Sequence, residues 1–261
     1  MKEGVITQDS RGAIYPDLEG KRVIISGGAS GIGAGIVEGF VEQGSAVGFI
    51  DISGDAGHSL CRSLDYAAHQ PVFETCDVTD TPAYTATLAN MADTLGGCDV
   101  LINNAGNDHR HTVESVTDAS WDDSIAINLK HQFFAAQSLV DTMRQNGGGS
   151  IINLGSISWH LGIQDLVVYQ TAKAAIEGLT RSLARELGRD NIRVNAILPG
   201  NVETPRQKQW YTPEGEAEIV AAQCLNGRIQ PSDIAAMALF LASQQARFCT
   251  GHNYWVDAGW R

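Results

Sequence analysis

The chain has 261 residues, 43% of them hydrophobic, and its formal net charge is −12. This length and apolar content are compatible with one doubly wound α/β domain that buries a substantial core. The acidic balance, without any basic stretch, argues against nucleic acid and against an anionic membrane as partners. No apolar run approaches the roughly 18 residues that cross a bilayer, and the polar first residues do not resemble a signal peptide.

The five cysteines are scattered along the chain and include no Cys-x-x-Cys pair. This usage is typical of reduced residues in a cytoplasmic protein rather than of disulfides or zinc ligands. The seven histidines show no metal-ligand spacing either. We therefore predict a cytoplasmic protein without a metal site.

A glycine-rich turn follows the first predicted strand. Residues 22–26 are a short β-branched run, and the helical pattern that begins after the turn continues to residues 43–44. A turn of this kind between strand and helix predicts a pyrophosphate site, because glycine lets the backbone approach the phosphates and the helix N-terminus offers N–H donors. The alternative is that the glycines serve only tight packing. The predicted phosphate-binding residues are Gly27, Ser30, Gly31, Ile32 and Gly33.

Asp51 ends the second predicted strand, at residues 46–50, and lies eighteen residues beyond Gly33. In a dinucleotide fold a carboxylate near this position accepts hydrogen bonds from the adenosine ribose hydroxyls and repels a 2′-phosphate. No Arg or Lys stands at residues 29–30 or 52–55 to bind that phosphate. The pattern predicts NAD rather than NADP as cofactor. The alternative is a solvated turn aspartate.

Strands and helices alternate along the rest of the chain, which predicts a seven-stranded parallel sheet with helices on both faces, the doubly wound Rossmann arrangement. We expect a single domain at residues 21–261 after a lead-in at 1–20, with a substrate lid at about 201–230. The site should lie at the carboxyl ends of the strands. Further strands are predicted at 71–76, 99–102, 150–154, 192–197 and 253–256, and helices at 54–68, 82–95, 213–224 and 232–243.

Tyr169 and Lys173 stand four residues apart in a helical pattern and therefore share one face. A tyrosine hydroxyl has a pKa of about 10, and a nearby cation favours its phenolate and so makes it a better base. Ser156 follows the strand at 150–154 and could hold the reacting oxygen. Asn128 lies inside a predicted helix, which is unfavourable unless its side chain makes a specific hydrogen bond. The alternative is an amphipathic helix with an ordinary Tyr and Lys.

These residues together identify the chain as resembling the short-chain dehydrogenase/reductase family from about residue 20 to 261. The resemblance rests on the glycine motif led by Ser26 (many members have Thr first), Asp77-Val78, Asn103-Asn104-Ala105-Gly106, Asn128, Ser156, Tyr169, Lys173 and Pro199-Gly200.

The resemblance implies a role for each catalytic residue. Tyr169 would be the acid/base, Lys173 would lower its pKa and bind the nicotinamide ribose, and Ser156 would orient the substrate oxygen. Asn128 would hold a water that links Lys173 to a proton relay. The resemblance also implies a homotetramer or homodimer. Further cofactor-binding residues would be Asp77, Val78, Asn104, Ala105, Gly106, Pro199, Gly200, Val202 and Thr204.

Four segments, at residues 106–111, 155–162, 210–217 and 250–261, resemble a narrower group of the family: bacterial NAD-dependent enzymes that oxidise D-xylose at C1 to the lactone. A sugar needs several polar partners, because each buried hydroxyl left unpaired costs about 1–3 kcal/mol. We expect Trp159 to cover the apolar face of the pyranose. Together with Ser156 and Tyr169, the predicted substrate residues are Asn107, Asp108, His109, Arg110, Ser158, Trp159, His160, Gln164 and Trp210.

Other functions remain as alternatives. One is a dehydrogenase for another aldose, such as L-arabinose, D-galactose or a deoxy-sugar, or for a non-sugar secondary alcohol. The polar residues at 107–111 disfavour a fatty-acyl or steroid substrate. From a different class, a regulator could bind the dinucleotide without turnover, but such a protein need not contain Ser156, Tyr169 and Lys173.

Overall fold

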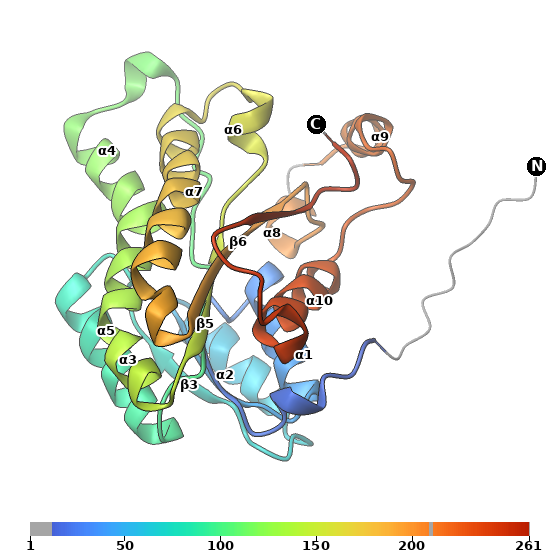
Figure 1. Ribbon diagram of the computed structural model, residues 1–261. Coiled ribbons are helices and arrows are strands. Elements are labelled where there is room, and N and C mark those ends of the chain that lie inside the picture. Colours follow the sequence, from blue (N-terminus) through green and yellow to red (C-terminus); the bar gives the residue numbers. More distant parts are fainter. Residues whose placement is uncertain (1–11, 209–210, 261) are drawn as a thin grey trace, which may run out of the picture.

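The computed structural model describes residues 12–208 and 211–260, and within them the chain builds one seven-stranded sheet (Figure 1). The strand order is β3-β2-β1-β4-β5-β6-β7, and all six neighbouring pairs are parallel. This confirms the predicted doubly wound fold. The strands are β1 (Arg22–Ser26), β2 (Ala46–Asp51), β3 (Val72–Thr75), β4 (Val100–Asn103), β5 (Gly149–Leu154), β6 (Ile192–Pro199) and β7 (Asn253–Val256).

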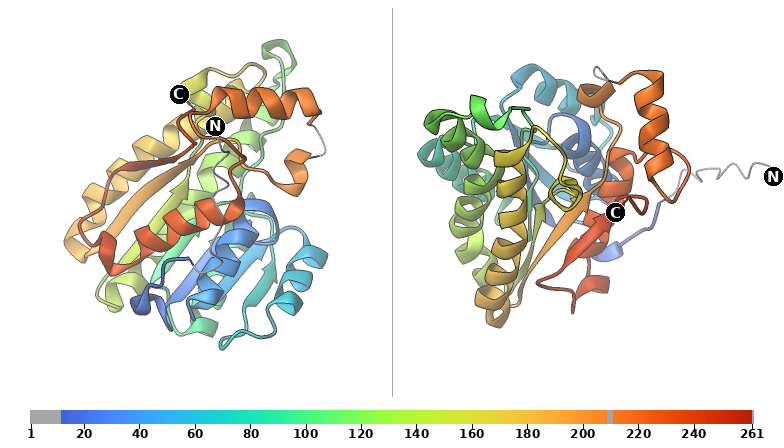
Figure 2. Two further views of the ribbon diagram at one scale, coloured as in Figure 1. Left: turned by 90° about the vertical axis from the view of Figure 1, so that its right-hand side faces the viewer. Right: turned by 90° about the horizontal axis from the view of Figure 1, so that it is seen from above.

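Helices cover both faces of the sheet, on opposite sides in Figure 2. Because successive strand residues point to opposite faces, Val23 and Ile25 belong to one core cluster and Ile24 to another. The first cluster includes residues of α1 (Gly31–Glu42), α2 (Gly54–Ser63) and α10 (Pro231–Ala242). The second includes residues of α3 (Thr81–Leu95), α5 (His131–Gln145) and α7 (Val167–Leu187).

The carboxyl ends of the strands that carry the predicted motifs are aligned in the sheet. The register pairs Ser26 at the end of β1 with Asn103 at the end of β4, and Asn103 with Asn153 in β5. Strand order also reverses between β1 and β4, because β2 and β3 lie on one side of β1 and the later strands on the other. Ligands of open α/β sheets bind at such a switch point.

Several elements differ from their predicted extents. The predicted helix at 54–68 ends at Ser63, and the last helix begins at Pro231 and ends at Ala242. The long helical region around Asn128 is interrupted by a π-helical segment, which the sequence pattern did not predict. The remaining helices are α4 (Asp118–Ile125), α6 (Ser158–Leu161), α8 (Pro205–Lys208) and α9 (Pro213–Ala222), the π-helical segment η3 (Ala126–Lys130), and the 3₁₀ turns η1 (Pro16–Leu18), η2 (Val113–Ser115), η4 (Gly188–Asp190) and η5 (Gln244–Ala246).

Part of the predicted lead-in packs on the domain. Leu18 is fully buried in the first core cluster, and the backbone N–H of Tyr15 donates to Oε1 of Gln43, 2.8 Å away. Core packing therefore begins before residue 21. Within the described residues, no helix has the length and apolarity needed to cross a membrane.

Phe40 on α1 tests the packing between α1 and α10, because its side chain is fully buried in the core cluster that both helices share. We expect Phe40→Ala to lower the free energy of unfolding by about 3–5 kcal/mol, since it removes apolar contacts and leaves a cavity. Urea denaturation measures the change. Phe248→Ala is the control, because Phe248 is 89% exposed and its loss should change stability by no more than about 0.5 kcal/mol.

Candidate active site

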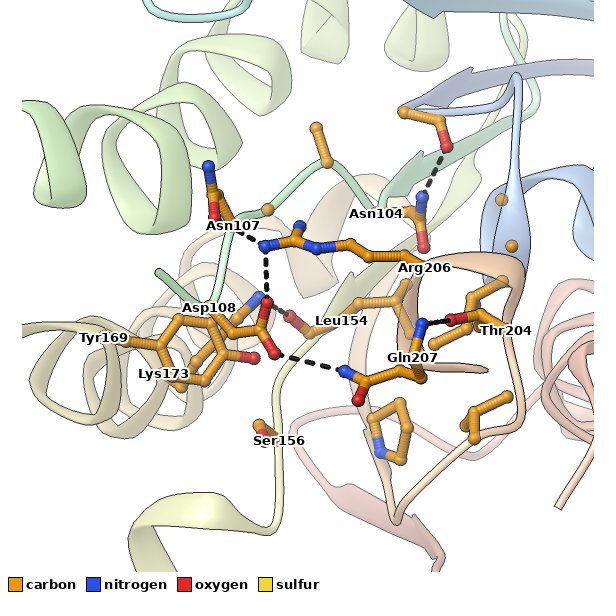
Figure 3. A pocket seen from close by; sticks show the side chains of 18 of the residues that line it. Asn104, Asn107, Asp108, Leu154, Ser156, Tyr169, Lys173, Thr204, Arg206 and Gln207 are labelled. Atoms are coloured by element: carbon orange, nitrogen blue, oxygen red, sulfur yellow. Dashed lines mark hydrogen bonds and ion pairs between the residues drawn. The ribbon is translucent and has the colours of Figure 1, made fainter. Parts of the chain in front are cut away.

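A cavity of about 620 Å³ opens at the carboxyl ends of the strands, as predicted. It extends from the glycine-rich turn to the Tyr–Lys helix, and Figure 3 shows the polar side chains around its inner part. The predicted residues that line it are Gly27, Ser30, Gly31, Ile32, Gly33, Asp51, Asp77, Val78, Asn104, Ala105, Gly106, Asn107, Asp108, Arg110, Ser156, Ser158, Tyr169, Lys173, Pro199, Gly200, Val202 and Thr204.

Gly27 and Gly33 of the glycine-rich turn have no room for a side chain. A Cβ on Gly33 would lie 1.9 Å from the carbonyl oxygen of Gly27, and one on Gly27 would lie 2.8 Å from Cα of Ala105. Gly27 and Gly31 also adopt positive φ angles of 67° and 55°, which favour glycine. Since α1 begins at Gly31, its N-terminal N–H groups and dipole end lie at the cavity wall. The turn therefore fits a pyrophosphate.

Ser26 and Asn104 join this turn to the loop after β4. The hydroxyl of Ser26 accepts hydrogen bonds from the backbone N–H groups of Asn104 and Ala105, at 3.1 and 3.2 Å. The amide of Asn104 donates in return to the carbonyl oxygens of Ser26 and Gly27, at 3.1 and 2.8 Å. A serine at the first position of the motif thus supplies the hydroxyl that ties two walls of the cavity together.

Asp51 lines the cavity at the end of β2, which lies on the other side of β1 from β4 and β5. Its carboxylate accepts the backbone N–H of Ala29 at 3.0 Å and that of Ser53 at 2.9 Å. These bonds orient the carboxylate beside the glycine-rich turn. Among the described residues, the other side chains that line this end are Ile52, Cys76, Asp77 and Val78, and none of them is basic.

Lys173 is buried at 3% exposure, and its Nζ donates to the carbonyl oxygen of Leu154, the last residue of β5, at 2.8 Å. Its ammonium lies 5.7 Å from the ring centre of Tyr169 on the same face of α7. Ser156 follows β5, and its hydroxyl donates to Oγ of Ser158 at 3.0 Å. The structure thus brings Ser156, Tyr169 and Lys173 together at one end of the cavity.

Burial is the largest influence on the pKa values of Tyr169 and Lys173. It raises the pKa of Tyr169 to about 12, with a smaller rise from the Asp108 carboxylate, whereas hydrogen bonding to Ser156 and the charge of Arg206 act to lower it. Burial also lowers the pKa of Lys173 to about 8. Burial thus holds the pKa of Tyr169 above its ordinary value. The expectation that Lys173 lowers this pKa stays a prediction.

Asn128 makes the specific hydrogen bonds that its position in a helix required. Its side chain is fully buried, and Oδ1 accepts the backbone N–H of Asn107 at 2.8 Å. Its Nδ2 donates to the carbonyl oxygens of Asn107 and Ser124, both at 3.0 Å. Asn128 therefore fixes the loop after β4, and the π-helical turn gives it this direction. A role in holding a relay water stays a prediction.

Four predicted substrate residues do not line the cavity: His109, Trp159, His160 and Gln164. Nε1 of Trp159 instead donates to Glu177 at 2.7 Å, and Nε2 of His160 lies 2.8 Å from the same oxygen. Trp159 thus lies away from the cavity, because Glu177 on α7 holds both rings beside the helix. The expectation that it covers a pyranose face stays a prediction.

The other two predicted residues contact the protein mainly through their backbones. The carbonyl oxygen of His109 lies 3.2 Å from Nδ1 of His111. The carbonyl oxygen of Gln164 accepts a hydrogen bond from Arg110 at 3.3 Å. Trp210 lies outside the described residues.

The sequence did not predict four polar residues that line the cavity: Asn201, Arg206, Gln207 and Tyr211. They belong to the segment predicted as a lid, so the sequence indicated their region but not their individual directions. Nη2 of Arg206 lies 2.8 Å from Oδ1 of Asp108, a residue in the loop after β4. Leu161, Ile163, Leu166 and Trp260 add an apolar part to the wall.

The chain is similar to known proteins over almost its whole length. A family model described as enoyl-(acyl carrier protein) reductase matches residues 27–261. D-xylose 1-dehydrogenase of Caulobacter vibrioides is 56% identical over 249 residues, which cover 95% of this chain and 99% of that protein. The chain belongs to the short-chain dehydrogenase/reductase family. A probable galactose dehydrogenase of Rhizobium meliloti is 42% identical over 94% of this chain and 96% of its own length.

A solved member of the family shares the fold closely. The structure of 7α-hydroxysteroid dehydrogenase, complexed with NADH and 7-oxo glycochenodeoxycholic acid, superposes with a TM-score of 0.90 at 32% identity. The match covers 94% of this chain and 96% of that one. Membership of this family makes the chain an oxidoreductase. Among the described residues, no group of three or more His, Cys, Asp or Glu side chains could hold a metal ion.

Gly33 tests the phosphate-binding turn. We expect Gly33→Ala to weaken binding of the dinucleotide at least tenfold, because the new Cβ would displace the carbonyl of Gly27 and open the turn. Titration of intrinsic fluorescence with NADH measures the affinity. Gly178→Ala on α7 is the matched control, because a Cβ there meets no atom within 4 Å. Equal affinities for the two variants would contradict the assignment of the turn.

Proposed function

We propose that this protein is an NAD-dependent aldose 1-dehydrogenase that oxidises D-xylose at C1 to the lactone. The observation that carries the proposal is the 56% identity to D-xylose 1-dehydrogenase over 95% of the chain. The cavity supports it, because a tyrosine, a serine and a buried lysine meet at one end of a cleft with a phosphate-binding turn at the other.

In the proposed reaction, Tyr169 removes the proton of the C1 hydroxyl as general base. Ser156 donates a hydrogen bond to the same oxygen as carbonyl character develops, and so holds it near the phenol. Lys173, fixed by the carbonyl of Leu154, places a positive charge 5.7 Å from the phenol ring and favours its phenolate. Bound NAD supplies the hydride acceptor and a positive charge on its nicotinamide ring.

The raised pKa of Tyr169 sets a requirement for this chemistry. Because burial raises the pKa of Tyr169 to about 12, the neutral phenol predominates at pH 7. Each positive charge near the phenol and each hydrogen bond to the phenolate increases the phenolate fraction. Ser156 and Arg206 act in that direction, and Lys173 adds a positive charge 5.7 Å from the ring centre.

We assign the cofactor as NAD because of Asp51. Its carboxylate is held beside the glycine-rich turn by two backbone N–H groups and would accept the ribose hydroxyls of the adenosine. A 2′-phosphate there would meet the charges of Asp51 and Asp77 without a basic partner among the described lining residues. Val78 would contact the adenine ring, and Val202 and Thr204 the nicotinamide carboxamide.

For the sugar, we propose Asn107, Asp108 and Arg110 as the polar partners among the predicted residues, because all three line the cavity. Residues 201–230 would act as the substrate lid, since Arg206 and Gln207 of this segment reach the loop after β4. D-galactose is the second candidate substrate, favoured by the 42% identity to the probable galactose dehydrogenase.

Oligomeric state and location stay proposals as well. We propose a homodimer or homotetramer, because α4, α5 and α7 carry large exposed apolar side chains, namely Trp121, Phe133 and Val167 at 41, 40 and 48% exposure. A cytoplasmic location is consistent with five free cysteines.

NADH formation from a panel of aldoses, each with NAD and with NADP, tests the proposed function directly. We expect D-xylose to give the highest kcat/KM and NAD to be preferred over NADP. A clear preference for D-galactose would change the assigned sugar but not the proposed reaction, which is oxidation at C1 with NAD. Turnover of non-sugar alcohols in place of every aldose would contradict the proposed substrate class.

Tyr169→Phe tests the proposed general base. We expect kcat to fall by about 10²–10⁴-fold, because proton transfer from the C1 hydroxyl loses its acceptor, while NADH affinity changes little. Steady-state kinetics and fluorescence titration measure the two quantities. Tyr66→Phe serves as control, because Tyr66 is 65% exposed and does not line the cavity. Turnover of Tyr169→Phe near that of the unmodified protein would overturn the mechanism.

A further inference from the structure

A polar bridge spans the substrate end of the cavity, between α8 and the loop after β4 (Figure 3). The guanidinium of Arg206 contacts Oδ1 of Asp108 at 2.8 Å and Oδ1 of Asn107 at 2.9 Å. Gln207 donates to Oδ2 of Asp108 at 3.2 Å. Two segments about a hundred residues apart in sequence are thus joined over the cavity by three side-chain contacts.

The bridge continues into the rest of residues 201–230. The hydroxyl of Tyr211 lies 2.7 Å from Oε1 of Gln207 and 2.6 Å from Oδ1 of Asn201. Arg228 donates to the same oxygen of Asn201 at 2.9 Å, and its guanidinium lies 4.9 Å from the ring centre of Tyr211. Movement of α8 would therefore break contacts with Asp108 while the remaining contacts stay within the same segment.

Such a bridge is weak enough to open. The side chains of Arg206 and Asp108 are 52 and 36% exposed, and ion pairs at this exposure add little to stability. The helix α8 itself has four residues. Little stability is therefore lost when Arg206 leaves Asp108.

The two charges act on Tyr169 in opposite directions. The Asp108 carboxylate disfavours the phenolate and raises the pKa of Tyr169, whereas the Arg206 guanidinium lowers it. The other charged and titratable groups near the phenol are Lys173 on α7 and His111, whose Nε2 accepts the backbone N–H of Val168 at 3.2 Å. Of these groups, Arg206 belongs to the segment proposed as the lid, and Asp108, His111 and Lys173 do not.

We infer that Arg206 is a positioning residue that couples closure of the lid to the general base: its guanidinium cancels the carboxylate of Asp108 beside Tyr169 only while α8 covers the cavity. With the lid open, Asp108 faces the phenol uncompensated and opposes ionisation. Proton removal is then favoured only over an enclosed substrate. This inference rests on the proposed function, because it requires Tyr169 to be the base.

The test is the pH dependence of kcat/KM, whose acid limb reports ionisation of the base in the free enzyme. We expect Arg206→Met to move this limb to higher pH by about 0.5–1 unit, because removal of the cation leaves Asp108 unopposed. Below the limb, kcat/KM should fall about three- to tenfold. Arg206→Lys keeps a positive charge at this position, so its acid limb should lie close to that of the unmodified protein.

Two further variants separate charge from structure. Asp108→Asn in the Arg206→Met background should return the acid limb to its original pH or below, whatever its effect on the magnitude of kcat/KM. Lys208→Met is the matched control on α8: it removes the same charge, but Lys208 pairs with Glu203 at 2.7 Å and does not line the cavity. Its acid limb should stay in place.

The outcomes distinguish this inference from the proposed function. All variants are assayed with the substrate that the unmodified protein oxidises best in the aldose panel. If that substrate is not D-xylose, the proposed substrate is wrong but the comparison of pH profiles remains valid. A fall of kcat/KM by the same factor at every pH in Arg206→Met would overturn the inference and indicate a merely structural contact. The inference would also be overturned if adding Asp108→Asn to Arg206→Met failed to return the acid limb to its original pH or below.

Discussion

A fully parallel sheet places the carboxyl ends of all its strands on one edge, and the site of this protein depends on that constraint. Ser26, Asn103 and Asn153 lie at one level because β1, β4 and β5 are in register there. The glycine-rich turn, the Asn107 loop and Ser156 each begin where one of these strands ends. Residues distant in sequence therefore converge without long loops.

Burial sets the electrostatics of this edge. Lys173 is 3% exposed, and Nζ is held by the backbone carbonyl of Leu154 rather than by a carboxylate. Behind it, His131 is also buried, and burial together with the charge of Lys173 lowers the pKa of His131 to about 3. His131 therefore stays neutral, and Lys173 is the cation on this side of the phenol. The same burial opposes ionisation of Tyr169, so the protein must supply compensating groups around it.

The sequence was sufficient for the features that depend on local pattern. Alternation of strands and helices predicted the sheet, and glycine spacing predicted the turn whose crowding at Gly33 excludes any side chain. The sequence did not predict the direction of a long side chain that has a choice of hydrogen-bond partners. Trp159 and His160 follow a strand that leads to the site, but Glu177 on the next helix binds both. Nothing local in the sequence indicated that choice.

The contact of Arg206 with Asp108 belongs to the same class of unpredictable features. The two residues lie in separate segments, and the predicted lid indicated only that some side chains from residues 201–230 would reach the cavity. Similarly, the pattern Tyr-x-x-x-Lys shows the neighbouring cation but not the burial that raises the pKa of Tyr169.

The π-helical turn at Ala126–Lys130 has a consequence for how this chain can change in length. A π-helical turn holds about one residue more than an α-helical turn. Each residue of an α-helix corresponds to a rotation of about 100° around the helix axis. Deleting a single residue here would leave a continuous α-helix but turn Asn128 away from the backbone of Asn107. The segment therefore tolerates exchange of side chains more readily than a change in residue number, although it lies between two helices rather than in a loop.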